Sequence, residues 1–479
     1  MRTVMVASEA LPFVKVGGLA DVVAALSRTL AKKKVNVSVV IPLYSRVKEH
    51  PHFKENATLF GRYEVRMSWR IQMCEVFQTD VRNVRYYFIG SDYYFSRGDV
   101  YGYNDDVERY AFFSLAAYRL IRDYLPKTDV VHLHDWQASA IPMLYLDEFG
   151  KLPVRTMLTI HNPCFQGICS RGDLPDFFNL GTDYFDGGLA RLDDNVNLLK
   201  SAIMLADRIT TVSPTHQKEL LSGISSYGLE KILHLRRSDF VGILNGLDTD
   251  EFDPKKDPLI VRNYGIGNAL SGKKENKEQL CRELNLVHGD YPLFCIVGRL
   301  TYQKGIGFII ANLEKIFQFR LNLVILGQGE EDYEHQLSFY CRGRDNVSCN
   351  IRFSNEMAHR IYAASDFLLM PSIFEPCGIA QMIAMRYGTL PIGSKVGGLI
   401  DTIDSYNQLN EDSANGLLFH LDDDNLLVNI IFALNLYEKK RVLAKLIHNA
   451  MRKDFSWDRS AEEYLRLYRQ MLEKNHLDS

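Results

Sequence analysis

Apolar runs alternate with helical periodicity along most of this chain. A buried strand is predicted over residues 3–7, apolar residues recur at helical spacing from Val22 to Leu30, and a second strand is predicted over 35–41. Further strands are predicted over 84–89, 129–135, 154–159, 208–212, 241–244, 291–297, 321–326, 347–353 and 366–370, and helices over 106–124, 193–206, 424–437, 440–452 and 458–473. This alternation predicts an α/β protein with parallel, doubly wound sheets.

Three segments interrupt the alternation. Apolar residues occur at every second position from Tyr63 to Met73, which predicts a half-exposed antiparallel excursion. The loop 91–104 is rich in Tyr, Asp and Gly; it suits stacking on sugars and is equally typical of an ordinary hydrated loop. Residues 246–290 are polar and predict a connection between domains. We therefore predict domains over 1–245 and 246–455, and a helix over 456–479 that packs back on the first domain.

Composition limits the class of protein. With 479 residues the chain is too long for one core and predicts about two or three domains. A net charge of −3 offers no field for nucleic acid or an anionic membrane, so an anionic ligand needs local basic groups. The eight cysteines form no Cys-x-x-Cys pair, which argues against a zinc ribbon and favours reduced thiols. With no apolar leader or membrane-length run, we expect a soluble, cytoplasmic protein.

One heptapeptide occurs twice. Lys15-Val-Gly-Gly-Leu-Ala-Asp21 returns as Lys395-Val-Gly-Gly-Leu-Ile-Asp401, and each copy follows a predicted strand. Paired glycines between a strand and a helix start leave free backbone N–H groups at the positive end of a helix dipole, which suits an anion. The same pattern is typical of a plain strand-to-helix turn in which glycine only relieves crowding.

Polar side chains gather at the predicted carboxyl ends of strands in the first half. Functional residues of doubly wound sheets lie at these ends. They are His134, Asp135, His161, Asn162 and Asn245. His132 and His134 face the same side of their strand, as zinc ligands do in some hydrolases. No ligand set such as His-Glu-x-x-His accompanies them, so histidines of the core or of a substrate site are favoured over a metal site.

Two charged sets stand out in the second half. Arg299 and Lys304 follow a predicted strand, and a guanidinium with an ammonium can hold a diphosphate as a leaving group without a metal. Glu375-Pro-Cys-Gly378 is predicted to start a helix, with Pro376 in its first turn. A carboxylate there can bind sugar hydroxyls or stabilise positive charge at an anomeric carbon. A solvated basic turn and an ordinary acidic residue at a helix start are the alternatives.

Together these motifs resemble the bacterial glycogen synthase and plant starch synthase family over nearly the whole chain. Their number and order carry the resemblance, since each motif alone is weak. The matching segments are Ser8-Glu9, Lys15–Val22, His134–Trp136, Thr159–Asn162, Phe165–Gly167, Thr211–Pro214, Asn245–Asp248, Gly298–Leu300, Gln303–Gly305, Glu375–Gly378 and Phe455–Trp457. The chain departs from the family at Val16, where Thr is common, and at Gln137, where bacterial relatives often have His.

The resemblance implies a retaining glycosyltransferase with two facing Rossmann-like domains of GT-B type. It would transfer glucose from ADP-glucose to the non-reducing end of an α-1,4-glucan such as glycogen, starch or a maltooligosaccharide. The catalytic residues that it implies are Glu375, Arg299, Lys304, His161 and Asp135. The substrate-binding residues that it implies are Glu9, Lys15, Gly17, Gly18, Asp21, Asn162, Asn245, Cys377 and Gly378. Because Lys15 matches a donor-contacting lysine of the family, Lys395 is expected to be a surface lysine.

The resemblance also implies that no metal is required, and we expect no pyridoxal phosphate. The net charge and the lack of a long apolar run argue against nucleic acid and membrane as partners. Four alternatives stay open: a related GT-B enzyme that uses UDP-glucose or an acceptor such as sucrose or a lipid, a pyridoxal-phosphate-dependent glucan phosphorylase, a catalytically silent glucan- or nucleotide-binding module, and a metal hydrolase built on His132 and His134. The oligomeric state and the length of the acceptor are left open.

Overall fold

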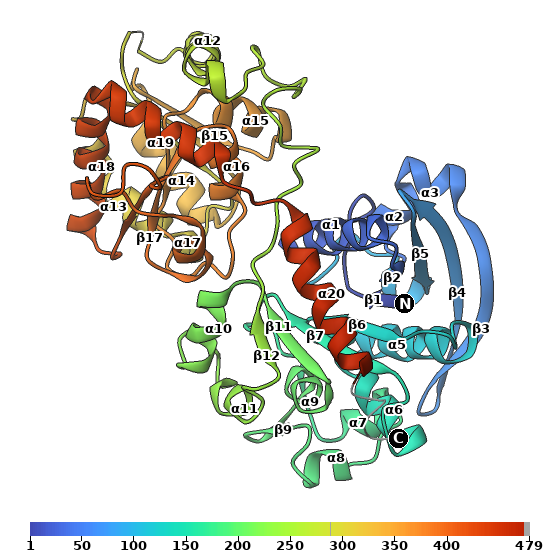
Figure 1. Ribbon diagram of the computed structural model, residues 1–479. Helices are drawn as coiled ribbons and strands as arrows, with labels where there is room; N and C mark the ends of the chain where they lie inside the picture. The colour runs from blue at the N-terminus through green and yellow to red at the C-terminus, as the bar shows by residue number, and fades with distance from the viewer. Residues whose placement is uncertain (288, 474–479) are drawn as a thin grey trace. The chain divides into compact units, whose positions relative to one another are not determined.

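The computed structural model describes residues 1–287 and 289–473 and divides the chain into two compact units. The first unit holds residues 1–246 and the segment that begins at Trp457, and the second holds residues 247–456. The sequence placed the domain boundaries one residue earlier in both places. Residues 474–479 of the predicted C-terminal helix lie outside the described part. Figure 1 labels many of the elements of the two units.

A nine-stranded sheet forms the centre of the first unit. From one edge to the other, its strands are β12 (Phe240–Gly242), β11 (Arg208–Thr211), β7 (Arg155–Ile160), β6 (Val130–His134), β1 (Arg2–Val6), β2 (Asn36–Pro42), β5 (Val84–Gly90), β4 (Arg70–Val81) and β3 (Thr58–Met67). All pairs from β12 to β5 are parallel, and β4 is antiparallel to both its neighbours. The winding of the chain reverses between β1 and β6, where doubly wound sheets carry their ligands.

Helices and short segments connect these strands. The longer helices are α1 (Gly18–Lys32), α5 (Asp106–Arg119) with the π-helical turn η1 (Leu120–Tyr124), α6 (Ile141–Phe149), α9 (Leu198–Leu205), α10 (Pro214–Leu221) and α20 (Trp457–Glu473). The shorter ones are α2 (Ser45–Glu49), α3 (Pro51–Asn56), α4 (Asp92–Phe95), η2 (Trp136–Ala138), α7 (Asp173–Phe177), α8 (Asp183–Asp186) and α11 (Glu230–Leu235). The helix predicted over 193–206 starts only at Leu198, because the preceding residues pair in a small sheet of β8 (Ile168–Cys169), β10 (Asn195–Asn197) and β9 (Arg191–Leu192).

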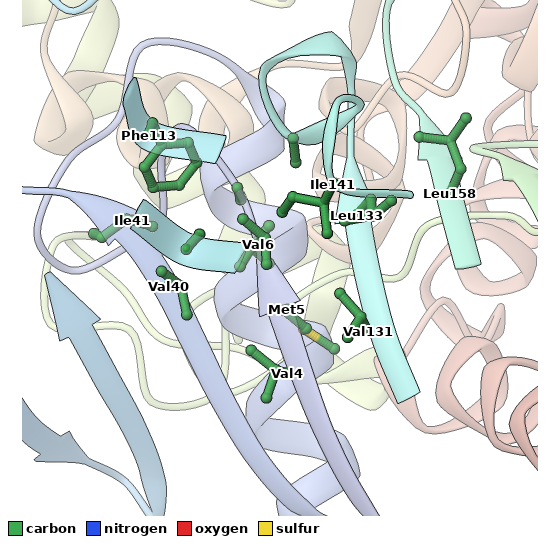
Figure 2. Packing of buried hydrophobic residues seen from close by; sticks show 14 of the residues in the cluster. Val4, Met5, Val6, Val40, Ile41, Phe113, Val131, Leu133, Ile141 and Leu158 are labelled. Carbon is green, nitrogen blue, oxygen red and sulfur yellow. The ribbon is translucent and has the colours of Figure 1, made fainter. Parts of the chain in front are cut away.

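The core of the first unit is built mainly from its parallel strands. Val4 and Val6 of β1 are at most 3% exposed, and Figure 2 shows them near Val131 and Leu133 of β6. Strands covered on both faces require near-continuous apolar runs, which is the pattern that predicted them. α20 joins this core through buried side chains that include Tyr468.

The apolar alternation from Tyr63 to Met73 is not one strand. It spans a tight turn between the antiparallel strands β3 and β4, across which Met67 pairs with Arg70. Tyr63 is buried, whereas Met73 is 53% exposed on the opposite face of the hairpin. The alternation of apolar residues predicted the antiparallel pairing correctly. The turn within this segment, however, places the apolar residues after it on the opposite face of the hairpin.

The second unit has a six-stranded, wholly parallel sheet. Its strands are β15 (Val347–Ile351), β14 (Asn322–Gly327), β13 (Leu293–Val297), β16 (Phe367–Met370), β17 (Leu390–Ser394) and β18 (Leu417–Phe419), in spatial order. Its helices are η3 (Ile266–Asn268), α12 (Ala269–Glu283), η4 (Tyr302–Lys304), α13 (Ile306–Ile316), α14 (Glu331–Cys341), α15 (Asn355–Ala364), α16 (Ala380–Arg386), α17 (Gly397–Thr402), α18 (Asp423–Glu438) and α19 (Lys440–Arg452). The winding reverses between β13 and β16, so the predicted pair of doubly wound units is confirmed.

The polar segment 246–290 is not a plain connector. From Leu247 onward it belongs to the second unit, and it contains α12, a helix of 15 residues. Lys273 of α12 is buried, and its amine donates hydrogen bonds to the Tyr387 carbonyl (3.0 Å) and to Thr389 Oγ1 (2.9 Å). Burial lowers the pKa of Lys273 to about 7. The lysine-rich composition suggested a solvated segment because composition does not report that one lysine faces the core.

Candidate active site

The sequence-predicted residues of the first unit meet where its sheet reverses winding. Glu9 follows β1, Asp135 follows β6, and His161 follows β7, the strand beside β6. All three therefore lie at carboxyl ends of parallel strands, as expected. We call Glu9, Lys15, Asp21, Asp135 and His161 the first half-site.

Glu9 holds the glycine turn that opens α1. Its Oε2 accepts hydrogen bonds from the backbone N–H groups of Val16 (2.5 Å) and Gly17 (3.1 Å), and Tyr101 donates to Oε1 (3.2 Å). Burial raises the pKa of Glu9. The expectation that the N–H groups of this turn are free for an anion is therefore wrong at Gly17, because a buried carboxylate must be hydrogen-bonded and takes them.

Lys15 lies beside this turn at the start of α1. Its ammonium is 2.8 Å from Oδ1 of Asp21, and the two side chains are 43% and 29% exposed. The pair places a cation and a carboxylate within reach of solvent at the helix start, next to Gly18, which has open space where a Cβ would be.

Asp135 has an unusual backbone for a residue with a side chain. Its φ of +55° lies in the left-handed region, which non-glycine residues enter at a cost and often at functional sites. Oδ1 accepts hydrogen bonds from the backbone N–H groups of His161 (2.7 Å) and Asn162 (3.3 Å). Burial, together with the negative charge of Glu9, raises the pKa of Asp135 to about 7 despite these two bonds.

Three histidines form a chain behind Asp135. His134 Nδ1 lies 2.9 Å from His161 Nε2, and burial lowers the pKa of His161 to about 3, so its ring is neutral. His132 hydrogen-bonds Tyr468 of α20 through Nδ1 (2.7 Å) and Thr159 through Nε2 (2.6 Å). Both nitrogens of His132 are thus engaged by the core. Within residues 1–287 and 289–473, no three His, Cys, Asp or Glu side chains gather as a metal ion would require.

Asn162 and Asn245 occupy two further strand ends. Asn162 Oδ1 accepts the N–H of Cys164 (3.1 Å), which shapes the loop after His161. Asn245 follows β12, which β11 and β7 separate from β6, and its buried Oδ1 has no hydrogen-bond partner in the described part of the chain. A buried carbonyl oxygen without a partner is unusual and suits a ligand donor.

The second half-site, which we define as Arg299, Lys304 and Glu375, lies where the second sheet reverses winding. Arg299 and Lys304 follow β13, and Glu375 follows the neighbouring strand β16. Lys304 donates to Glu375 Oε2 at 2.5 Å, and Ser372 donates to the same oxygen at 3.1 Å. The Glu375 side chain is 6% exposed and that of Lys304 is 24% exposed, so this ion pair is largely shielded from water.

The two loops of the second half-site lie against each other. Gly305 has a φ of +69°, and a Cβ there would stand 1.8 Å from the Pro371 carbonyl oxygen. The N–H of Ile373 also donates to the Gln303 carbonyl at 3.0 Å. Only glycine permits this approach. Arg299 is exposed, and its guanidinium donates to Gln303 Oε1 at 3.2 Å.

The second heptapeptide supports the Glu375 turn. The N–H of Gly398 donates to the Glu375 carbonyl at 3.0 Å, and a Cβ on Gly398 would stand 2.0 Å from the Cys377 carbonyl oxygen. Lys395 is exposed, as expected. The predicted helix start at Pro376 is wrong: α16 begins at Ala380, because Gly378 has a φ of +72°, which breaks the helical geometry before it.

Two supporting residues were missed by sequence reasoning. Tyr101 joins Ser8 (2.7 Å) to Glu9, although it lies more than 90 positions away in the sequence. Ser372 completes the bonds of Glu375. A serine after a strand end gives a weak signal for Ser372, and the tyrosine-rich loop gave one for Tyr101, but neither pattern names the partner.

The described helices include none long and apolar enough to cross a membrane.

The chain resembles known proteins over its whole length. Residues 2–235 match the model of the starch synthase catalytic domain, and residues 278–450 match that of glycosyl transferases group 1. A glycogen synthase of Clostridium botulinum (strain Alaska E43 / Type E3) is 40% identical over 480 residues, which cover 98% of this chain and 99% of the relative. A glycogen synthase of Lactobacillus acidophilus is 39% identical and covers 98% of this chain and 100% of its own length.

Solved structures agree with these relatives. The catalytic domain of starch synthase IV from Arabidopsis thaliana, bound to ADP and acarbose, superposes with a TM-score of 0.91 at 31% identity, covering 98% of this chain and 99% of that one. A sucrose-phosphate synthase from Thermosynechococcus elongatus has a TM-score of 0.63 at 19% identity over 99% of both chains, which shows the shared fold alone.

Proposed function

Because the chain belongs to the family of bacterial glycogen synthases and plant starch synthases, and is therefore a glycosyltransferase, we propose that it transfers glucose from ADP-glucose to the non-reducing end of an α-1,4-glucan with retention of configuration. The observation that carries the proposal is the shielded pair of Lys304 and Glu375 beside Arg299, where the second sheet reverses winding. ADP in the related starch synthase structure supports adenine as the donor base.

In this proposal the second half-site binds the nucleotide diphosphate. Arg299 and Lys304 carry the two positive charges that a diphosphate needs as the bond from the anomeric carbon to the phosphate oxygen breaks. Glu375 orients Lys304 and accepts hydrogen bonds from the hydroxyl groups of glucose. Cys377 and Gly378 form the backbone turn beside it.

The first half-site faces the sugar and the acceptor in this proposal. Glucose passes through an oxocarbenium-like species, and the acceptor hydroxyl bonds to the anomeric carbon on the face that the phosphate leaves. The proton of this hydroxyl moves to the departing phosphate. Asp135 and His161 line the reacting sugar. This role is proposed because both are polar residues in a largely buried place at the carboxyl ends of strands. The further residues proposed to contact substrate are Glu9, Lys15, Gly18, Asp21, Asn162 and Asn245.

We further propose that the reaction uses neither a metal nor pyridoxal phosphate, since the cationic pair can supply the charge that a metal would otherwise provide. The glucan acceptor is proposed from the names of the relatives. A cytoplasmic setting is proposed from the eight free cysteines, which suit a reducing compartment.

A donor panel tests this function. Purified protein is incubated with labelled ADP-, UDP- or GDP-glucose and with glycogen, sucrose or a lipid as the acceptor, and label in each acceptor is counted with and without a chelator. We expect ADP-glucose to give the fastest transfer and the chelator to have no effect. Faster transfer from UDP-glucose would change the donor, transfer to sucrose or lipid alone would change the acceptor, and binding of ADP-glucose without transfer from any donor would indicate a silent binding module.

A further inference from the structure

We propose that His134 is a positioning residue that fixes the ring proton of His161 on Nδ1, so that His161 presents an N–H donor to the substrate. The family resemblance described above assigns no role to His134. The position of the proton follows from the burial of the two rings and from their geometry. The use of that donor by a sugar oxygen rests on the proposed function.

The two rings share one hydrogen bond. His134 ends β6 and is fully buried, and its Nδ1 lies 2.9 Å from Nε2 of His161. Burial lowers the pKa of both histidines, that of His161 to about 3, so both rings are neutral near pH 7. A neutral imidazole has one N–H and one bare nitrogen. One of the two facing nitrogens therefore carries the proton and the other accepts it.

The other nitrogen of His134 decides between the two arrangements. Nε2 of His134 is buried and has no hydrogen-bond partner among the described residues. If His161 were the donor, His134 would carry its proton on this Nε2, which would bury an N–H group without an acceptor. Such orphaned donors are rarer in proteins than orphaned acceptors. The favoured arrangement has His134 donating from Nδ1 and leaves only a bare nitrogen unpaired.

The surroundings leave His134 no better partner. The ring of His132 is centred 4.2 Å away, but both nitrogens of His132 already hydrogen-bond Tyr468 and Thr159. His134 therefore binds His161 or nothing within the described part of the chain. The backbone N–H of His161 is itself held by Asp135 at 2.7 Å, so both the ring and the main chain of this residue are fixed.

This arrangement determines what His161 can do. Its Nε2 lone pair is used by His134, and its Nδ1 carries the ring proton. His161 thus has no free lone pair with which to take a proton from an acceptor hydroxyl, and it acts as a neutral hydrogen-bond donor to an oxygen of the substrate. The proton of the acceptor must leave on another group, which agrees with its transfer to the departing phosphate in the proposed reaction.

Nitrogen NMR of the full chain tests the tautomer without any substrate. The protein is labelled with ¹⁵N-histidine, and the signals of His161 are identified by their loss in His161→Asn. We expect Nδ1 of His161 to resonate as a protonated nitrogen and Nε2 as a bare, hydrogen-bonded one. A proton on Nε2 of His161 in the wild-type protein overturns the proposal. This measurement does not depend on whether a variant of His134 folds.

Two variants of matched shape test the role of His134. His134→Asn keeps an N–H donor near the position of Nδ1, whereas His134→Leu has a similar shape and no donor. We expect Asn to preserve the His161 tautomer and Leu to lose it, giving signals averaged between the two tautomers. An unchanged His161 spectrum in a folded Leu variant overturns the proposal; thermal melting establishes that both variants fold.

Glucose transfer is then measured with the same pair. We expect kcat to fall on the order of 10-fold in His134→Leu, a typical loss when a partner that orients a functional histidine is removed, and Asn to restore most of it. Equal losses in both variants would indicate a packing role and overturn the assignment. If the wild-type protein transfers no glucose from any donor, the proposed function fails while the NMR result still decides the tautomer.

Discussion

The two units wind their sheets in the same order, but they place different charged side chains where the winding reverses. Beside β1 and β6 the first unit buries two carboxyl groups, Glu9 and Asp135, and burial raises the pKa of both. Beside β13 and β16 the second unit places two cations, Arg299 and Lys304, and one buried carboxylate, Glu375, which Lys304 contacts. Parallel topology thus fixes where a ligand binds, whereas the loop residues decide which charge it meets.

The repeated heptapeptide does not mark equivalent places in this comparison. Its first copy follows β1, the first strand of its sheet, and its second copy follows β17, the fifth strand in its unit. The true counterpart of the first copy is the loop after β13, which holds Arg299 and Lys304. This explains why a motif repeated almost letter for letter supports the Glu375 turn in one unit and starts a long helix in the other.

The largest loss of activity should come from a change in the second half-site. Lys304→Ala removes a charge from the diphosphate site and leaves Glu375 buried without its cation, so we expect kcat/KM for transfer to fall on the order of 10²- to 10³-fold. Steady-state kinetics with ADP-glucose and glycogen measure this. Transfer at the wild-type rate would show that the second half-site does not bind the leaving group.

The two glycine pairs should differ in stability. Gly398→Ala places a methyl group 2.0 Å from the Cys377 carbonyl oxygen, whereas a Cβ on Gly18 meets nothing within 4 Å. We expect Gly398→Ala to lower the free energy of unfolding by about 1–3 kcal/mol and Gly18→Ala to change it by less than about 0.5 kcal/mol. Thermal or urea unfolding of the two variants decides this. Similar losses in both would restore the equivalence of the two copies.

The first half-site should make the free energy of unfolding depend on pH. Between the ordinary aspartate value near 4 and the raised pKa of about 7, folded Asp135 binds more protons than the unfolded chain does, so it favours folding less as pH rises. Asp135→Asn lacks this dependence. Relative to the wild type, we expect the variant to gain about 1 kcal/mol in unfolding free energy between pH 6 and pH 7. A difference that does not change with pH would contradict the raised pKa.

The smallest effect should come from the lysine of the second copy. Lys395 is exposed, so we expect Lys395→Ala to change unfolding free energy by less than about 0.5 kcal/mol and transfer hardly at all. Lys15→Ala is the matched comparison in the first copy, because it removes the partner of Asp21. Equal kinetic losses at the two lysines would show that the second copy also binds substrate.

Local pattern predicted the strands and the residues at their carboxyl ends, because burial on both faces leaves apolar runs and parallel pairing collects those ends. It did not predict contacts between distant segments, such as the hydroxyl of Tyr101 on Glu9. It also missed the buried amine of Lys273, since helical periodicity is weak in a segment where one charged residue faces inward. The helix start at Pro376 failed for a local reason, the left-handed backbone at Gly378.

The place of α20 has a consequence for how this protein is made. Residues 247–456 are synthesised before Trp457, yet Trp457 and Tyr468 belong to the core of the first unit. The first unit therefore completes its core only after the residues of the second unit have been synthesised, which departs from the usual N-terminal-first order. Until α20 arrives, His132 lacks its tyrosine partner, so the hydrogen bond at His132 Nδ1 depends on a segment that is made after the whole second unit.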